Sequence, residues 1–315
     1  MQKACPISRA RYKSASTILR FGATSKSPPS YPIAVRKSAN KNRLPNHISF
    51  DAAALLEPLS VAIHSVNRAA VTPGSTALVI GAGTVGLLVA AMARQSGCTF
   101  VTIMDVDAGR VEYAISNGFA THGYVVPKPL HSCASSSSIF TSSGTTTPSS
   151  DGATTPLSIY GGVESRLDGA KAVAADVLAV ARSDMVPLED DEDEGVDVTF
   201  ECTGKEACMQ TSLYATRPGG KVIMVGMGTP IQTLPLSAAH LREVDILGIF
   251  RYANTYATGI RLLGARGAMA LPSLDKMVTH RFKGLGAARE AFELAGRTVD
   301  DEGRLVLKVV IEAQA

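Results

Sequence analysis

The residues best suited to chemistry are three glycines within six positions and an acid that follows them. Gly81, Gly83 and Gly86 have the spacing G-x-G-x-x-G, and Asp105 lies nineteen positions beyond the last of them. The glycines stand between a short apolar run, 77–80, and a longer apolar stretch, 84–95. Those runs predict a buried strand and a helix, and Asp105 falls at the end of the next strand-like run. In this context the pattern predicts a site for a dinucleotide.

Each residue of the pattern has a physical task in such a site. Gly81 permits a tight turn, Gly83 lets the backbone approach a pyrophosphate, and Gly86 allows the helix to pack closely on the strand. The helix N-terminus offers unpaired N–H groups and a partial positive charge. Asp105 would accept hydrogen bonds from ribose hydroxyls and repel the extra phosphate of NADP, so NAD is the expected cofactor. The alternative interpretation is that the glycines merely form a turn.

Strand and helix patterns alternate through the rest of the chain. Strands are expected at 77–80, 99–104, 124–126, 196–200 and 221–225, and helices at 84–95, 108–116, 170–182 and 206–215. This alternation predicts an α/β fold with a doubly wound parallel Rossmann sheet. Residues 132–158 are dominated by Ser and Thr and bury little apolar surface, so they are expected to form a flexible insertion.

Composition limits the class of protein. The hydrophobic fraction of 45% and charged fraction of 19% are typical of globular proteins, and the net charge of +3 is too small to indicate nucleic-acid binding. The apolar stretch 76–93 contains three glycines, which favours a strand, turn and helix over a membrane span. The five cysteines lack C-x-x-C spacing, so neither a thiolate zinc cluster nor a redox pair is expected. Reduced thiols favour the cytoplasm.

The first fifty residues differ from the rest of the chain. They hold ten basic residues and no acidic one. That composition resembles a mitochondrial transit segment, which is the alternative to a cytoplasmic location. Pro28, Pro29 and Pro32 would interrupt an amphipathic helix, so an unstructured arm is the other interpretation.

From about Leu44 onward the chain resembles the medium-chain dehydrogenases, and among them the polyol branch of sorbitol, xylitol and L-arabinitol dehydrogenases. The glycine motif with Asp105 indicates only the superfamily, whereas Glu-Pro-Leu-Ser-Val and Phe-Arg-Tyr-x-Asn-Thr are typical of the polyol branch. The segments that carry the resemblance are 56–62, 81–86, 201–204, 225–228, 242–246, 250–255 and 278–282.

The resemblance implies roles for particular residues. Glu57 matches a glutamate that approaches the catalytic zinc directly or through water, and Arg251 and Tyr252 match residues at the substrate hydroxyls. The implied reaction oxidises a secondary alcohol to a ketone, with zinc lowering the hydroxyl pKa and hydride passing to NAD. The matched cofactor contacts are Gly81, Gly83, Thr84, Val85, Gly86, Asp105, Arg110, Cys202, Thr203, Val225, Gly226, Met227, Ile249, Phe250 and Arg251.

Structural interpretations of the same residues remain open. Glu57 precedes a proline and could cap a helix, Arg251 could form a surface ion pair, and Cys202 could be a small buried thiol. The histidines have no ligand spacing and are expected to be structural; they include His64, His122, His240 and His280.

The chain departs from the family at the zinc site. The family's separate N-terminal domain supplies a Cys and a Gly-His-Glu motif, and no Gly-His-Glu occurs here. We therefore expect a residual, incomplete GroES-like catalytic domain built from the chain ends, and a family zinc that this chain does not hold. The expected divisions are a basic, poorly ordered arm at 1–43, a Rossmann domain at 44–270 and a C-terminal return segment at 271–315.

Two functions follow as alternatives. The first is a truncated NAD-dependent polyol dehydrogenase whose zinc site is incomplete. The second is a non-catalytic NAD-binding or regulatory protein derived from such an enzyme. A quinone-reductase-like enzyme is disfavoured because Asp105 opposes NADPH. The expected partners are a small polyol and a second copy of the chain at the sheet edge, with no nucleic acid and no membrane.

Overall fold

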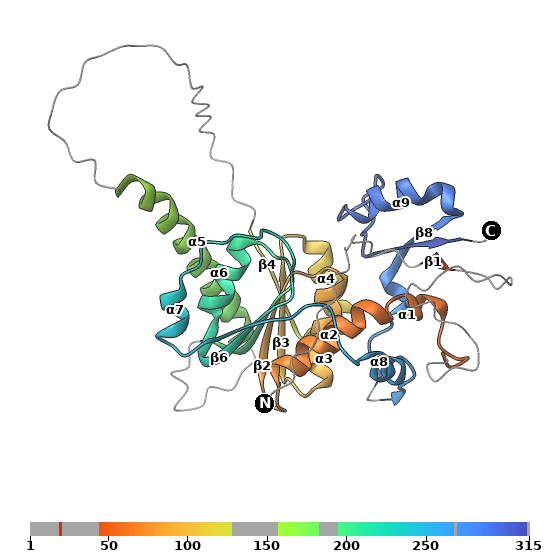
Figure 1. The fold of residues 1–315 in the computed structure, drawn as a ribbon, viewed down its shortest axis with the longest axis horizontal. Coiled ribbons are helices and arrows are strands. Elements are labelled where there is room, and N and C mark those ends of the chain that lie inside the picture. Colours follow the sequence, from red (N-terminus) through yellow and green to blue (C-terminus); the bar gives the residue numbers. More distant parts are fainter. Residues whose placement is uncertain (1–18, 21–43, 128–156, 183–194, 268–269, 314–315) are drawn as a thin grey trace, which may run out of the picture.

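A computed structural model describes residues 19–20, 44–127, 157–182, 195–267 and 270–313. Six parallel strands form the main sheet in the order β4-β3-β2-β5-β6-β7, with neighbouring strands hydrogen-bonded throughout (Figure 1). The strands are β2 (Thr76–Ile80), β3 (Phe100–Asp105), β4 (His122–Val125), β5 (Val196–Glu201), β6 (Thr216–Met224) and β7 (Asp245–Gly248). The order reverses direction between β2 and β5, and this switch point is where doubly wound sheets bind ligands.

Helices cover both faces of this sheet. One face carries α2 (Leu56–Ala69), α3 (Thr84–Gln95) and α4 (Ala108–Ser116), and the other carries α5 (Leu157–Arg182) and α6 (Glu206–Ala215) (Figure 1). α3 is apolar almost all round and buries every residue from Gly86 to Ala93, because α2 and the sheet enclose it. β2 is a continuous apolar run for the same reason, since a central parallel strand is covered on both faces.

A smaller unit adjoins the main sheet. Its three parallel strands have the order β1-β9-β8, namely β1 (Leu19–Arg20), β9 (Lys308–Glu312) and β8 (Val278–Lys283). α9 (Ala288–Ala295) packs on it and buries Ala291 against β9. The remaining helices are α1 (Phe50–Ala54), α7 (Leu236–His240), α8 (Tyr256–Leu263), and the 3-10 turns η2 (Asp275–Met277) and η3 (Leu285–Ala287). In Figure 1 this unit lies beyond α4, on the side away from α5.

The sequence-based expectations agree with most of this architecture. The predicted α/β fold and parallel Rossmann sheet are confirmed, and the helices at 84–95, 108–116 and 206–215 have the predicted bounds. The helix expected at 170–182 begins earlier, at Leu157, so residues 157 and 158 of the expected insertion belong to α5. The rest of that insertion, and all of the basic arm except β1, lies outside the described residues.

In the main sheet and its covering helices, the features that were not foreseen are α2, the edge strand β7, and the extension of β6 back to Thr216 through two glycines. The sequence also predicted no bounds for the smaller elements α1, α7, α8, α9, β1, β8 and β9. None of the helices within the described part of the chain combines the length and apolar character needed to cross a membrane.

Candidate functional site

The carboxyl ends of the parallel strands bring the predicted cofactor residues to one edge. Backbone bonds continue from strand to strand there: Gly81 N donates to the Met104 carbonyl at 2.7 Å, and Cys202 N donates to the Ile80 carbonyl at 2.9 Å. Farther along, Val225 N donates to the Glu201 carbonyl at 2.8 Å. The first residues beyond β2, β5 and β6 are therefore held in line, although more than a hundred positions of sequence separate the first of them from the other two.

The glycine turn is built as the motif predicts. Gly81 has a φ of +102°, a left-handed conformation that favours glycine. A Cβ on Gly86 would overlap the Gly81 carbonyl oxygen, so no larger residue fits between α3 and the turn. Gly83 is the N-cap of α3 and has no side chain to bond the first amides of the helix. These amides are left for a ligand, as at other anion-binding helix N-termini.

Asp105 is fastened directly to this turn. Its Oδ2 accepts a hydrogen bond from Ala82 N at 2.7 Å, and its Oδ1 accepts one from Asp107 N at 3.0 Å. The carboxylate is half-buried at the end of β3. Because each carboxylate oxygen can accept a second bond, the group remains able to receive the hydroxyls of a ribose. The structure thus brings Asp105 and the glycine turn together, as the sequence predicted.

Glu201 is a residue of this site whose role the sequence did not reveal. Its carboxylate is only 2% exposed and accepts bonds from Thr203 N at 2.8 Å, from Gly204 N at 2.9 Å, and from the Thr203 hydroxyl. The loop that follows β5 therefore folds around a buried acceptor, which fixes the predicted contacts Cys202 and Thr203. The sequence signal was an acid at the end of an apolar strand, directly before residues that resemble cofactor contacts.

The loops after β5 and β6 lie against one another. A Cβ on Gly204 would collide with the backbone of Gly228, and one on Gly226 would collide with the backbone at Thr203 and Gly204. Glycine at these positions lets two backbones approach closely beside the dinucleotide turn. Val225 and Gly226 are thereby placed near Thr203, whereas the side chain of Met227 points outward and is 78% exposed.

The cysteine of this edge is not a thiolate. Burial, followed by the charge of Glu201, raises the pKa of the Cys202 thiol well above its usual value. A protonated thiol is a poor nucleophile and a poor metal ligand. This agrees with the interpretation of Cys202 as a small packed side chain beside the cofactor.

The three candidate catalytic residues lie on α2 and after β7. Glu57 is in the first turn of α2, where its charge acts on Lys308 and on Tyr256. The Tyr252 hydroxyl lies 3.2 Å from that of Tyr256, whose pKa is raised by burial, by this hydrogen bond and by Glu57. Arg251 has a φ of +54° and lies 5.7 Å from the Phe250 ring. Tyr256 is thus near both candidates: it shares a hydrogen bond with Tyr252 and is affected by the charge of Glu57.

The described residues do not form a zinc site. No group of three or more His, Cys, Asp or Glu side chains within them is placed to hold a metal. Glu57 has Lys308 and Tyr256 in its surroundings, and burial lowers the pKa of Lys308 while the Glu57 charge raises it. A catalytic zinc needs three protein ligands and an open position. The residues present therefore do not fit this metal.

The chain is similar to known dehydrogenases in a family segment, in sequence and in structure. Residues 159–265 match the zinc-binding dehydrogenase family. The chain is 34% identical to sorbitol dehydrogenase of Gallus gallus over 81% of this chain and 56% of that protein, and 34% identical to the enzyme of Homo sapiens over 80% and 55%. The chain is thus similar to zinc-binding dehydrogenases in one segment and to sorbitol dehydrogenases over most of its length. It spans between about half and three fifths of the length of these curated relatives.

Solved structures of other dehydrogenases have a similar fold. L-idonate 5-dehydrogenase from Escherichia coli has a TM-score of 0.57 and 20% identity, covering 86% of this chain and 59% of that one. A dehydrogenase from Sinorhizobium meliloti bound to NADP has a TM-score of 0.58 and 20% identity, covering 85% and 61%. At these identities the likeness concerns the fold alone.

Two glycines of the motif, Gly83 and Gly86, allow effects on stability and on NAD binding to be separated. Gly86→Ala should destabilise the protein by on the order of 3 kcal/mol or more, because the new Cβ overlaps the Gly81 carbonyl. Gly83→Ala should leave the melting temperature nearly unchanged, since its φ of −77° suits alanine and only Arg110 lies near, at 3.9 Å. The same Cβ should nevertheless weaken NAD binding about tenfold or more by blocking the pyrophosphate.

Thermal denaturation and calorimetric NAD titration of both variants check this prediction. A Gly86→Ala protein as stable as the unmodified chain would contradict the packing described here. A Gly83→Ala protein that binds NAD with unchanged affinity would contradict the position given to the pyrophosphate.

Proposed function

We propose that this chain binds NAD at the carboxyl edge of its six-stranded sheet and serves the oxidation of a polyol. The observation that carries the proposal is the joint geometry of turn and acid. Gly86 leaves room for no side chain beside Gly81, and Asp105 accepts a bond from the Ala82 amide within that turn. A pyrophosphate on the N-terminus of α3 and an adenosine ribose on Asp105 fit this arrangement together.

The charge of Asp105 favours NAD over NADP. A 2′-phosphate would approach a carboxylate already fixed by Ala82 N and Asp107 N, and Asp105 could not turn away without losing both bonds. Arg110 lies on the same side of the turn and provides the cation that could accept such a phosphate if Asp105 were removed. Because one structural neighbour holds NADP, the fold by itself does not decide this choice.

The substrate class is inferred from the relatives. Sorbitol dehydrogenases are the matched curated proteins, and the segment at 250–255 carries the matching polyol motif. In this proposal Arg251 and Tyr252 donate hydrogen bonds to substrate hydroxyls, and Ile249 and Phe250 border the nicotinamide. NAD, when bound, would accept a hydride from the carbinol carbon, and the hydroxyl on that carbon would release its proton to water.

In the family a zinc ion lowers the pKa of the reacting hydroxyl. Among the described residues Glu57 is the candidate to approach such an ion, directly or through water, and no group of three or more potential ligands is found there. We therefore propose that the chain by itself binds NAD but oxidises polyols slowly. The alternative is a non-catalytic NAD-binding protein. It is favoured by the same observation, namely that the described residues supply no further metal ligands beside Glu57.

We also propose that two copies of the chain associate at β7. β7 ends the order of the main sheet, so among the described strands its outer side has no neighbour. The connection from β6 to β7 leaves large apolar side chains exposed, including Ile231 at 84% and Leu241 at 76%. Sedimentation velocity measures the association of the two copies directly.

Free thiols at Cys98 and Cys202 agree with a reducing, cytoplasmic location.

NAD should bind at least tenfold more tightly than NADP, a difference of about 1.4 kcal/mol. Asp105→Ser should narrow this gap, because it removes the repelling charge and leaves Arg110 in place. Calorimetric titration of both proteins with both cofactors is the measurement. Equal affinities in the unmodified chain would overturn the assignment of Asp105.

Purified chain given NAD, zinc and sorbitol, xylitol or L-arabinitol should produce NADH slower by orders of magnitude than a full-length sorbitol dehydrogenase does. Metal analysis should find well below one zinc per chain, because the described residues offer one candidate ligand. One equivalent of zinc with rapid turnover would contradict this. NAD binding with no turnover at all would favour the non-catalytic alternative.

A further inference from the structure

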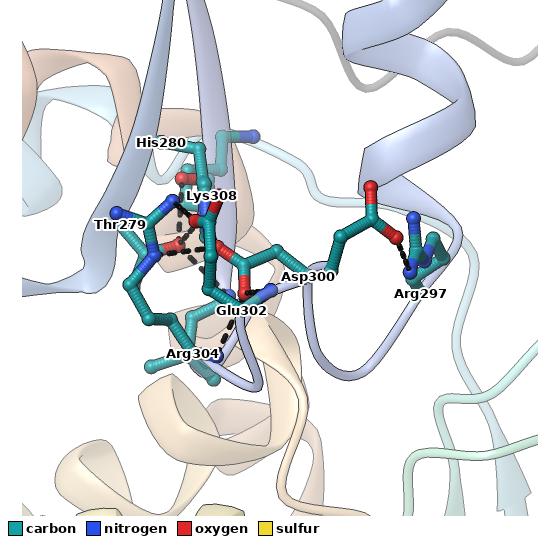
Figure 2. A network of polar contacts seen from close by, with 9 residues as sticks. Thr279, His280, Arg297, Asp300, Glu302, Arg304 and Lys308 are labelled. Carbon is teal, nitrogen blue, oxygen red and sulfur yellow. Dashed lines mark hydrogen bonds and ion pairs between the residues drawn. The ribbon is translucent and has the colours of Figure 1, made fainter.

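A buried carboxylate closes the turn that precedes β9. Asp300 is 7% exposed, and its Oδ1 accepts bonds from Glu302 N at 3.0 Å and from Arg304 N at 2.7 Å. Its Oδ2 accepts bonds from Arg304 Nε at 2.6 Å and from His280 Nε2 at 3.1 Å (Figure 2). Burial by itself would raise the pKa of Asp300, but these bonds from His280 and Arg304 lower it below the usual value. The carboxylate is thus charged at neutral pH and ties the turn to β8.

The chain that leaves this turn is held on one side by the small unit. Val306 N donates to the Thr298 carbonyl at 2.8 Å, and Leu307 N donates to the Thr279 hydroxyl at 3.1 Å. Both amides are thus bonded within the small unit, whereas the carbonyls of the same two residues accept bonds from the Rossmann domain. We call residues 304–308 the bridging segment, because it joins the small unit to the Rossmann domain.

The carbonyls of the bridging segment contact the dinucleotide turn. The Leu307 carbonyl accepts a bond from the Thr84 hydroxyl at 2.8 Å, at the first residue of α3. The Val306 carbonyl accepts a bond from Arg110 Nη2 at 3.1 Å. Thr84 and Arg110 are both residues for which cofactor contacts are proposed. The C-terminal part of the chain therefore touches the cofactor site through its backbone.

The Arg110 guanidinium has N–H donors left for a ligand even though one of its nitrogens bonds the Val306 carbonyl. Its Nη1 lies 3.9 Å from the position that a Cβ on Gly83 would take, and its Nε is buried with no hydrogen-bond partner. The guanidinium thus lies beside the N-terminus of α3, where a pyrophosphate is proposed. Guanidinium groups bind phosphate through paired N–H donors when their orientation is fixed.

We propose that Asp300 is a positioning residue of the dinucleotide site. It fixes the bridging segment, the Val306 carbonyl fixes the Arg110 guanidinium, and Arg110 meets the adenosine-diphosphate half of the cofactor. Asp300 touches no ligand in this scheme. The inference rests on the proposed binding of NAD, and it adds that the C-terminal turn sets the strength of that binding.

A double-mutant cycle on NAD affinity tests the proposal. Asp300→Asn should weaken NAD and ADP roughly fivefold or more, because the turn loses its charged acceptor. In the Arg110→Gln background the same change should weaken NAD less than about twofold, since the group through which Asp300 acts is gone. Titration calorimetry below the melting temperature of each variant gives the four affinities.

The neighbouring carboxylate supplies a matched control. Asp301→Asn makes the same charge change one residue away, at a side chain that is 84% exposed and pairs with Arg297. It should leave the affinity for NAD unchanged. Thr279→Val is a second route to the same effect, because it removes the hydroxyl that accepts Leu307 N. The same hydroxyl contacts His280 Nδ1 at 2.9 Å, so this change also acts on the partner of Asp300. It should weaken NAD, and again only when Arg110 is present.

Equal losses of affinity in both Arg110 backgrounds would overturn the proposal, since they would mean that Asp300 acts on the fold in general. Unchanged affinity in both Asp300→Asn and Thr279→Val would overturn it as well. Failure of the unmodified chain to bind NAD or ADP would instead overturn the proposed function, and it would be seen before any variant is compared.

Discussion

The close approach of α3 to the turn before it is the constraint on which the cofactor site depends. Gly86 packs so near the Gly81 carbonyl that a single methyl group would separate them. This contact sets where α3 begins, and therefore where its unpaired amides point. It also places Ala82 N within reach of Asp105, so that the strand β3 and the turn hold each other. Displacing α3 would disturb both the pyrophosphate position and the ribose acceptor.

The remaining parts of the site are fixed to this centre by buried hydrogen-bond acceptors. Glu201 gathers the amides of the loop after β5, and Asp300 gathers those of the turn before β9. In each case a carboxylate that is almost fully buried is stabilised by N–H donors, which offsets the cost of removing its charge from water. One loop carries the proposed cofactor contacts Cys202 and Thr203, and the other supports Arg110.

Sequence patterns predicted the parts of this arrangement that depend on neighbouring residues. The glycine spacing and the apolar run that follows it gave the bounds of α3, and the position of Asp105 gave its role beside the turn. These features are local, because a turn and a helix start are decided within a few residues. α2 was not predicted, although its buried residues recur with the period of a helix.

Features that depend on distant contacts could not be predicted in the same way. Asp300 and His280 are twenty positions apart, and only the pairing of β8 with β9 brings them together. Nothing in the residue types distinguishes Asp300 from the exposed Asp301 beside it. The link from Val306 to Arg110 joins residues 196 positions apart through a backbone carbonyl, which has no signature in the sequence at all.

Hydrogen–deuterium exchange with and without NAD tests the central claim most directly, because it reports where the cofactor rests. The account predicts slower amide exchange at residues 81–86, 202–204 and 225–228, all at the carboxyl edge of the sheet. Little change is expected at the opposite edge, where Arg94 and Asn117 border a separate hollow. Protection confined to that opposite edge, or none at the glycine turn under saturating NAD, would contradict the account.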